Sequence, residues 1–84
     1  MIKFHPSGKK QYFNSDGQFH NEKGPAIVFP FFSLKEYWIN GKRHRLDGPA
    51  IEYDYFISWW INDQLIPVTS QEDFERYIKL LAFT

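Results

Sequence analysis

The sequence predicts a mainly β protein with one C-terminal helix: an antiparallel β-hairpin-repeat meander of about eight short strands, with the amphipathic helix docked on one face. Three observations predict this fold. A segment recurs along the chain, turn-forming dipeptides punctuate it, and helical periodicity is confined to the last residues. The 84 residues are expected to form a single domain, with hairpin repeats over about 7–66 and the helix over about 69–82.

The repeat is visible when the chain is compared with itself. DGQFHNEKGPAIVF (16–29) aligns without a gap with NGKRHRLDGPAIEY (40–53), at an offset of 24 residues, so that His20 matches His44. A third, decayed copy begins at SWWINDQLI (58–66) and lacks the Gly-Pro-Ala half. Such decay is typical of a terminal repeat, because one of its faces has no neighbouring repeat.

One unit of the repeat has the signals of a hairpin followed by a second turn. Aromatic and β-branched residues at 36–39 suit a pleated strand, and Asn40-Gly41 is typical of a two-residue type I′ turn. The chain returns through 42–44, and Asp47-Gly48 is expected to turn it again. If Gly48 has a positive φ angle, replacement by valine should destabilise the fold strongly. Pro49 then opens the next strand, where its missing N–H does least harm.

Applied along the whole chain, these signals predict a series of short strands. We expect them near 2–5, 10–14, 18–20, 26–29, 35–39, 42–44, 50–53, 57–61 and 64–66. Pro30 interrupts the pattern between the fourth and fifth of these strands, and predicts an edge or a loop there.

The C-terminal residues change to a helical pattern. Thr69 followed by Glu72 is a capping-box signature, which predicts that Thr69 caps the helix. Four apolar residues then share one helical face at positions i, i+3, i+4 and i+7: Phe74, Tyr77, Ile78 and Leu81. A helix of this length is not stable alone in water, so we expect it to dock on the sheet.

Composition limits the classes of function. The chain has no cysteine, which excludes disulfides and thiolate zinc sites and favours a reducing compartment such as the cytoplasm. Its ten basic and ten acidic residues balance, which argues against general binding to nucleic acid or to a membrane surface. The N-terminus MIKFHPSGKK has no apolar core of a signal peptide, and no apolar run approaches the ~20 residues needed to span a bilayer.

The best copy, WINGKRHRLDGPA (38–50), resembles a repeat found in small proteins of bacteriophages and in longer arrays of large DNA viruses. It is also distantly similar to MORN-type hairpin repeats. The resemblance covers about residues 7–66 and implies a hairpin-repeat fold and a viral accessory role in the host cytoplasm, without an assigned active site. The first copy has Asn21 in place of Arg45 and Lys23 in place of Asp47, so an Arg–Asp pair is expected in the second copy only.

His20 and His44 occupy the same repeat position, which raises the question of a metal site. Zinc needs three or four ligands, and the chain offers no cysteine and no closely spaced histidine pair. We therefore expect no metal and no cofactor. The expected role of each histidine is structural, with one ring nitrogen donating to a backbone carbonyl near the following turn.

The run Lys42-Arg43-His44-Arg45 allows two interpretations. Neighbouring residues in a strand point to opposite faces, so Arg43 and Arg45 are expected on one face and Lys42 and His44 on the other. The run is then either a solvated hairpin edge whose charges prevent aggregation, or an anion site in which an arginine binds a phosphate or carboxylate beside stacked rings.

The tryptophans point to a recognition surface. Trp59 and Trp60 are adjacent, so one is expected in the core under the helix while the other faces away; Trp38 and Trp60 are matched positions expected on one face. One helix covers only one face of a sheet, which leaves a second face rich in rings for a partner. The residues expected to contact a partner or ligand are Tyr37, Trp38, Arg43, His44, Arg45, Trp59 and Trp60.

The sequence favours a binding protein over an enzyme. It has no cysteine nucleophile, no Gly-x-Ser-x-Gly and no phosphate-binding glycine loop. The first hypothesis is a phage or viral accessory protein that engages a host protein, such as a defence factor. The alternative is sequestration of a small anionic ligand such as a nucleotide signal. Single-stranded RNA binding is a third hypothesis that the neutral charge disfavours, and the sequence leaves a homo-oligomer open.

Overall fold

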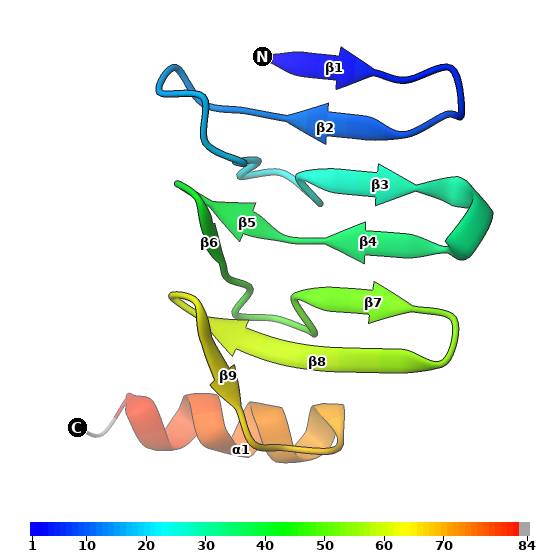
Figure 1. Cartoon of the computed structure of the whole chain (residues 1–84). Coiled ribbons are helices and arrows are strands. Elements are labelled where there is room, and N and C mark those ends of the chain that lie inside the picture. Colours follow the sequence, from blue (N-terminus) through cyan, green and yellow to red (C-terminus); the bar gives the residue numbers. More distant parts are fainter. Residues whose placement is uncertain (83–84) are drawn as a thin grey trace.

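The computed structural model, which describes residues 1–82, confirms the predicted fold class. Seven strands form one antiparallel meander sheet, a separate two-stranded hairpin projects from it, and one helix lies at the C-terminal end (Figure 1). The molecule is a flat slab of 43 × 30 × 17 Å, because the strands are short and follow one another along its long axis.

The strands of the large sheet follow the order β1-β2-β3-β4-β7-β8-β9. Their bounds are β1 (Ile2–Phe4), β2 (Lys10–Tyr12), β3 (Ile27–Phe29), β4 (Leu34–Glu36), β7 (Ile51–Tyr53), β8 (Phe56–Ile61) and β9 (Gln64–Ile66). The projecting hairpin consists of β5 (Trp38–Ile39) and β6 (Lys42–Arg43). These bounds agree closely with the expected strands, with two exceptions. The segment 18–20 contributes only a single bridge between Phe19 and Phe13. The expected strand 35–39 is divided at residue 37 into β4 of the large sheet and β5 of the projecting hairpin. Pro30 begins a short 3-10 turn, η1 (Pro30–Phe32), that connects β3 to β4, which agrees with the loop expected at this proline.

The hairpin turns have the backbone that their residues predict. Asn40 and Gly41 have φ angles of 48° and 78°, and Asn62 and Asp63 have 48° and 67°. These are the paired left-handed conformations of a type I′ turn, which asparagine, aspartate and glycine tolerate best. Gly48, by contrast, does not have a positive φ angle. The second turn of the repeat therefore does not need glycine for its backbone angles.

Successive hairpins are joined by a repeated set of hydrogen bonds. The backbone N–H of Gly41 donates to the carbonyl of Phe19 at 2.9 Å, and that of Asp63 donates to the carbonyl of Arg43 at 2.9 Å. The histidines add a side-chain bond at the same joints. His20 Nδ1 accepts the backbone N–H of Asn40 at 2.9 Å. His44 Nδ1 accepts that of Asn62 at 3.0 Å.

This histidine bond corrects the sequence-based expectation in one respect. The role is structural, as expected, but the ring nitrogen accepts a hydrogen bond from the next hairpin instead of donating to a carbonyl near its own turn. The reason is that a type I′ turn leaves the N–H of its first residue without a partner inside the hairpin, and a ring nitrogen of the preceding hairpin lies within hydrogen-bond distance of it.

The pairing register divides the side chains between two faces of the sheet. Glu36 pairs with Ile51, and Ile51 pairs with Ser58, so these three side chains lie on the same face. We call this the open face, and it also carries Trp38 and Trp60, whose indoles bond to Glu36 and Ser58. The opposite face, which we call the helix face, carries the alternate residues and is covered at its C-terminal end by the helix.

The main core lies between the last two strands and the helix α1 (Gln71–Leu81). Trp59 is 2% exposed, packs its ring 6.2 Å from that of Phe74, and donates its indole N–H to Gln71. Ile66 completes this cluster, and Tyr77 and Ile78 of the helix pack against it. Of the two adjacent indoles, Trp59 is therefore the core residue, and Trp60 remains half-buried on the open face.

The helix begins one residue later than its sequence signature suggests. Ser70, and not Thr69, is the N-cap: its hydroxyl accepts the backbone N–H of Asp73 at 3.1 Å. The capping pair is therefore Ser70 and Asp73. It has the same spacing as the predicted pair of Thr69 and Glu72, a hydroxyl side chain followed three residues later by an acidic one. Among the described residues, no helix is both long enough and apolar enough to cross a membrane.

We predict that Ser70→Ala lowers the free energy of unfolding by about 1 kcal/mol, because it removes the acceptor for one unpaired N–H of the first helical turn. Thr69→Ala is the matched control and should change stability by less than about 0.5 kcal/mol. Urea denaturation of both variants measures the difference. A larger loss in the Thr69 variant would contradict the assignment of the cap.

Candidate functional site

Five side chains from three hairpins form one continuous stack on the open face. The ring of Phe19 lies 5.1 Å from that of Phe13 and 5.4 Å from that of Trp38. The Arg43 guanidinium follows, 5.7 Å from Trp38 and 3.7 Å from Trp60. In the first hairpin, Phe19 lies between the rings of Phe13 and Trp38. In the second hairpin, the Arg43 guanidinium occupies the equivalent place between the rings of Trp38 and Trp60.

The charge of Arg43 is paired within the chain. Its Nε donates to the Asp63 carboxylate at 2.7 Å across the joint between the second and third hairpins. This hydrogen bond holds the pKa of the Asp63 carboxyl below its usual value, and the positive charges of Arg43 and Lys42 lower it further. The stack is thus a structural unit with its one cation already neutralised.

A groove of about 330 Å³ opens beside this stack on the open face. Its lining residues are Glu36, Trp38, Arg43, Ile51, Tyr53, Phe56, Ser58, Trp60 and Leu65. Three of them form an apolar rim that solvent reaches: Tyr53 is 42%, Phe56 58% and Leu65 57% exposed. The polar atoms of the floor are satisfied, since the indole of Trp38 bonds Glu36 and that of Trp60 bonds Ser58. The groove is therefore an apolar surface bordered by two fixed indoles.

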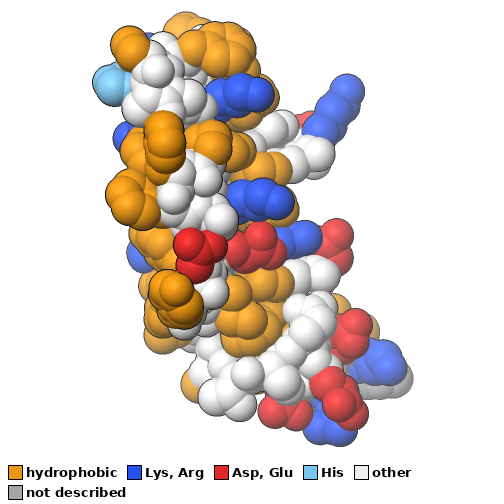
Figure 2. Space-filling model, turned by 90° about the vertical axis from the view of Figure 1, so that its right-hand side faces the viewer, with side chains coloured by type: hydrophobic (Ala, Val, Ile, Leu, Met, Phe, Trp, Pro, Cys, Tyr) orange, Lys and Arg blue, Asp and Glu red, His pale blue; other side chains and the backbone are white. Residues whose placement is uncertain are grey.

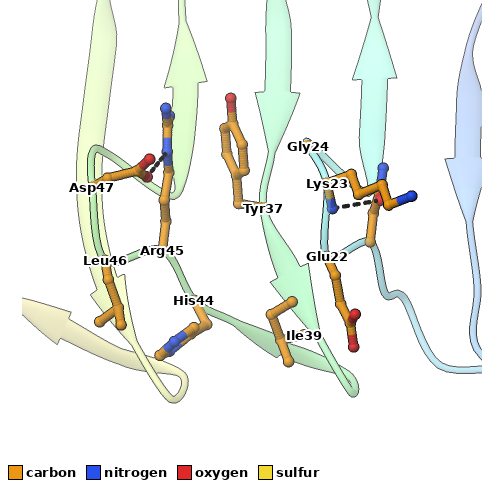
Figure 3. A pocket seen from close by; sticks show the side chains of 10 residues that line it. Glu22, Lys23, Gly24, Tyr37, Ile39, His44, Arg45, Leu46 and Asp47 are labelled. Atoms are coloured by element: carbon orange, nitrogen blue, oxygen red, sulfur yellow. Dashed lines mark hydrogen bonds and ion pairs between the residues drawn. The ribbon is translucent and has the colours of Figure 1, made fainter.

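A second cavity, of about 420 Å³, lies on the other side of the chain between two equivalent loops (Figure 3). The loops are residues 21–24 of the first repeat and 44–47 of the second. Tyr37 stands between them, and the guanidinium of Arg45 lies 3.9 Å from the centre of its ring. Burial raises the pKa of the Tyr37 hydroxyl, and the carboxylates of Glu52 and Asp47 act in the same direction, whereas Arg45 lowers it.

Arg45 makes three hydrogen bonds that tie its loop to the following turn and to β7. Its Nε donates to Asp47 at 2.9 Å, and its Nη1 donates to the carbonyl of Pro49 at 3.1 Å and to Glu52 at 3.0 Å. The Arg–Asp pair is the one expected in the second copy alone. In the first copy Asn21 takes over part of this role, because its side-chain N–H donates to the carbonyl of Pro25 at 3.0 Å.

The two arginines do not share a face, which corrects the sequence-based expectation. Arg43 lies against Trp38 and Trp60, whereas Arg45 lies against Tyr37, and Tyr37 and Trp38 are neighbours that point to opposite faces. Strict alternation fails because β6 ends at Arg43, and the chain leaves the strand conformation before Arg45. The basic run is therefore divided between two places, and each arginine is paired with carboxylates.

The seven residues expected to contact a partner fall into three groups. Trp38, Arg43 and Trp60 line the groove on the open face. Tyr37, His44 and Arg45 line the cavity of Figure 3. Trp59 lies under the helix and is not accessible to a partner.

Sequence reasoning missed the rim of the groove: Tyr53, Phe56 and Leu65. Alternation in Ile51-Glu52-Tyr53 places Ile51 and Tyr53 on one face, and this pattern was a usable signal. Nothing local identified Leu65, which reaches the groove only because β9 folds back beside Trp60. Within residues 1–82, no three histidine or carboxylate side chains come together as metal ligands.

Comparison with protein-family models finds no match to this chain, and comparisons with curated proteins and with solved structures find no significant match. The functional argument therefore rests on the geometry of the groove and of the cavity.

We predict that Gly48→Ala destabilises the protein by about 1–3 kcal/mol, the cost of disturbing hydrogen bonds to a charged group. A Cβ at Gly48 would lie 2.8 Å from the Arg45 guanidinium carbon, so Arg45 would have to leave its three bonds. Gly24→Ala is the control, because a Cβ there meets nothing closer than 3.9 Å. The Gly48 effect should shrink in an Arg45→Ala background, and an unchanged effect in that double-mutant cycle would refute the explanation.

Asp63 should contribute a pH-dependent part of the stability. Because its pKa is lower in the folded protein than its usual 3.8, this contribution is present at neutral pH and disappears as the pH falls below about 4. Asp63→Asn tolerates the left-handed turn but lacks the charge. The stability difference between wild type and Asp63→Asn, measured by urea denaturation, should therefore be largest near neutral pH and smallest in acid. Asp54→Asn, in a different turn, is the control, and a pH-independent Asp63 difference would contradict the assignment.

Proposed function

We propose that the protein is a non-enzymatic binding protein that engages another protein through the groove on its open face. The observation that supports this most directly is the apolar rim of Tyr53, Phe56 and Leu65 beside two half-buried indoles, on a face that the helix does not cover. Rings and an arginine around a small apolar depression are the composition of binding hot spots between proteins.

The charges in the groove favour a protein partner over an anionic ligand. Among the described residues that line the groove, Arg43 is the only cation, and its Nε lies 2.7 Å from the Asp63 carboxylate. The groove also contains Glu36, whose carboxylate would repel a phosphate. A neutral apolar side chain of a partner, such as leucine or phenylalanine, avoids both costs and fits a volume of about 330 Å³.

The repeat supports a setting for this interaction. Its resemblance to repeats of bacteriophages and large DNA viruses favours an accessory protein that acts on a protein of the host. Inhibition of a host defence factor is the role that this setting favours, and the partner would then meet the protein in the host cytoplasm.

A second candidate function is the binding of a small anionic ligand such as a nucleotide in the cavity of Figure 3. The observation in its favour is that Tyr37, His44 and Arg45 line the same 420 Å³ cavity, so a ring and a cation could contact a base and a phosphate. The three bonds that Arg45 makes within the chain weaken this candidate, because a phosphate would have to compete with Asp47 and Glu52. RNA binding is weaker still, since the cation of the ring stack is paired.

Phe56→Glu should abolish capture of a protein partner from a bacterial lysate, because it places a charge on the apolar rim of the groove. Tyr55→Glu is the matched control: Tyr55 is 101% exposed, lies next to Phe56 and does not line the groove. A photo-crosslinking residue at position 56 should label the same partner, and one at position 55 should not. Equal capture by both variants, or no specific partner, would contradict the proposal.

Thermal shifts of Phe56→Glu and of Arg45→Ala separate the two candidate functions. A nucleotide at 100 times its dissociation constant stabilises a protein by ~2.7 kcal/mol. A thermal shift with mono-, di- or cyclic nucleotides that Arg45→Ala removes and Phe56→Glu retains would favour the cavity over the groove.

A further inference from the structure

The first strand presents unpaired backbone groups at the edge of the sheet. Met1 and Phe13 exchange two hydrogen bonds, and the N–H of His5 donates to the carbonyl of Lys9. In an antiparallel pair such bonded positions alternate, so Met1, Lys3 and His5 bond inward to β2. The N–H and C=O groups of Ile2 and Phe4 therefore point outward, away from the sheet.

The two ends of the sheet differ in how they are covered. At the C-terminal end the helix packs on the last strands and buries Trp59. At the N-terminal end, β1 is the edge strand of the sheet, and no described residue pairs with its outer side (Figure 1). Ile2 is 38% and Phe4 69% exposed, so this edge is apolar as well as unpaired. An open edge of this kind can accept a further strand.

The charged side chains of β1, of β2 and of the turn between them are all positive, and a neighbouring loop brings Glu22 and Lys23 together near Met1. Residues 1–15 contain Lys3, Lys9 and Lys10 and no acidic residue. The ammonium of Lys3 lies 5.3 Å from the ring of Phe13, and that of Lys10 lies 5.9 Å from the ring of Phe4. On the face that Figure 2 shows, the acidic side chains lie mostly between the middle of the molecule and its C-terminal end. The edge therefore attracts a strand that carries negative charge.

The same charges argue against pairing with a second copy. In the antiparallel register that uses both Ile2 and Phe4, Lys3 of one copy would lie directly opposite Lys3 of the other. That position is a non-hydrogen-bonded pair, where side chains are closest, and like charges there are destabilising. A lysine in an edge strand is a common means of preventing such self-association.

We propose that β1 is a second recognition site, at which an extended acidic segment of a partner protein adds an eighth strand to the sheet. The backbone of Ile2 and Phe4 supplies the hydrogen bonds, and Lys3 pairs with an acidic side chain of the segment. Apolar residues on either side of that acid pack beside Ile2 and Phe4, in the alternation of a β-strand. This site is distinct from the groove of the proposed function and does not depend on it.

A labelled octapeptide in which valine alternates with glutamate is the probe. Titration followed by fluorescence anisotropy and by amide hydrogen exchange of the whole protein should show binding. The amides of Ile2 and Phe4 should become protected from exchange, whereas that of Lys3 should change little, because it already bonds β2. An octapeptide with lysine in place of glutamate should bind at least 10-fold more weakly, and added salt should weaken the binding of the glutamate peptide.

The decisive variants are Phe4→Pro and Phe4→Ala. Proline removes the outward N–H, which the contact with β2 does not use, whereas alanine keeps it and loses the same ring. Binding should be at least 10-fold weaker for Phe4→Pro than for Phe4→Ala, with unchanged amide protection in β2 for both. Lys3→Glu should reverse the preference to the lysine peptide, and it tests the charge pairing without altering the backbone.

Four outcomes would overturn the proposal. Equal binding by the proline and alanine variants would show that the outward N–H is not used. Equal binding of the two peptides by wild type would remove the role of Lys3. A dimer of the free protein in sedimentation that Phe4→Pro dissociates would assign the edge to a second copy. Loss of peptide binding in Phe56→Glu with retention in Phe4→Pro would place the peptide in the groove.

Discussion

The structure depends on one repeated joint, in which each hairpin is bonded to the turn of the next. At both joints a histidine nitrogen accepts the N–H of the first turn residue, and a backbone carbonyl accepts that of the second. A third bond links the residue after each histidine to a strand of the next hairpin: Asn21 to the carbonyl of Trp38, and Arg45 to that of Trp60. Because three hydrogen bonds link each hairpin to the next in the same pattern at both joints, the joint fixes the spacing and direction of successive hairpins.

The fixed spacing explains where the copies differ from one another. A side chain from each hairpin must fill the gap between the large rings of two successive hairpins, and Phe19 fills the first gap as a simple ring. Arg43 fills the second with a planar guanidinium, which stacks on the ring of Trp60 but brings a charge. That charge requires a partner, and the third turn supplies it: Asp63 stands where the second copy has Gly41, and its carboxylate bonds Arg43. The arginine at position 43 and the aspartate at position 63 are therefore coupled differences between the copies. Arg43, which looks free in the sequence, is part of the stack.

Local signals in the sequence predict most of the fold, and contacts between repeats account for what they miss. The turn at Asn40-Gly41 and the strand at 51–53 are determined by their own residues, so a few residues suffice to predict each of them. The role of Gly48 is not readable in this way, because glycine is needed there for the close approach of the Arg45 side chain and not for a left-handed backbone. The separation of Arg43 from Arg45 was missed for a similar reason: it depends on where β6 ends, which the pairing with the neighbouring hairpin decides. Sequence patterns therefore located the two indoles of the groove, but neither its exposed rim nor the carboxylates that pair with the two arginines.

The third copy loses its repeat residues where the stack must end. Ile66 takes the position that His44 has in the second copy, and the described residues that follow it form α1 instead of a hairpin whose turn would need an acceptor. Trp59 likewise takes the position of Tyr37, and the helix residue Phe74 covers it as Arg45 covers Tyr37. The decayed copy thus converts a polar joint between hairpins into an apolar contact with a helix, which is how an array of repeats closes its end. No comparable conversion occurs at β1, where the described chain offers rings, lysines and outward backbone groups instead of a cap. Within the described residues, the sheet therefore has one end that the helix covers and one edge strand, β1, whose outward backbone groups have no partner.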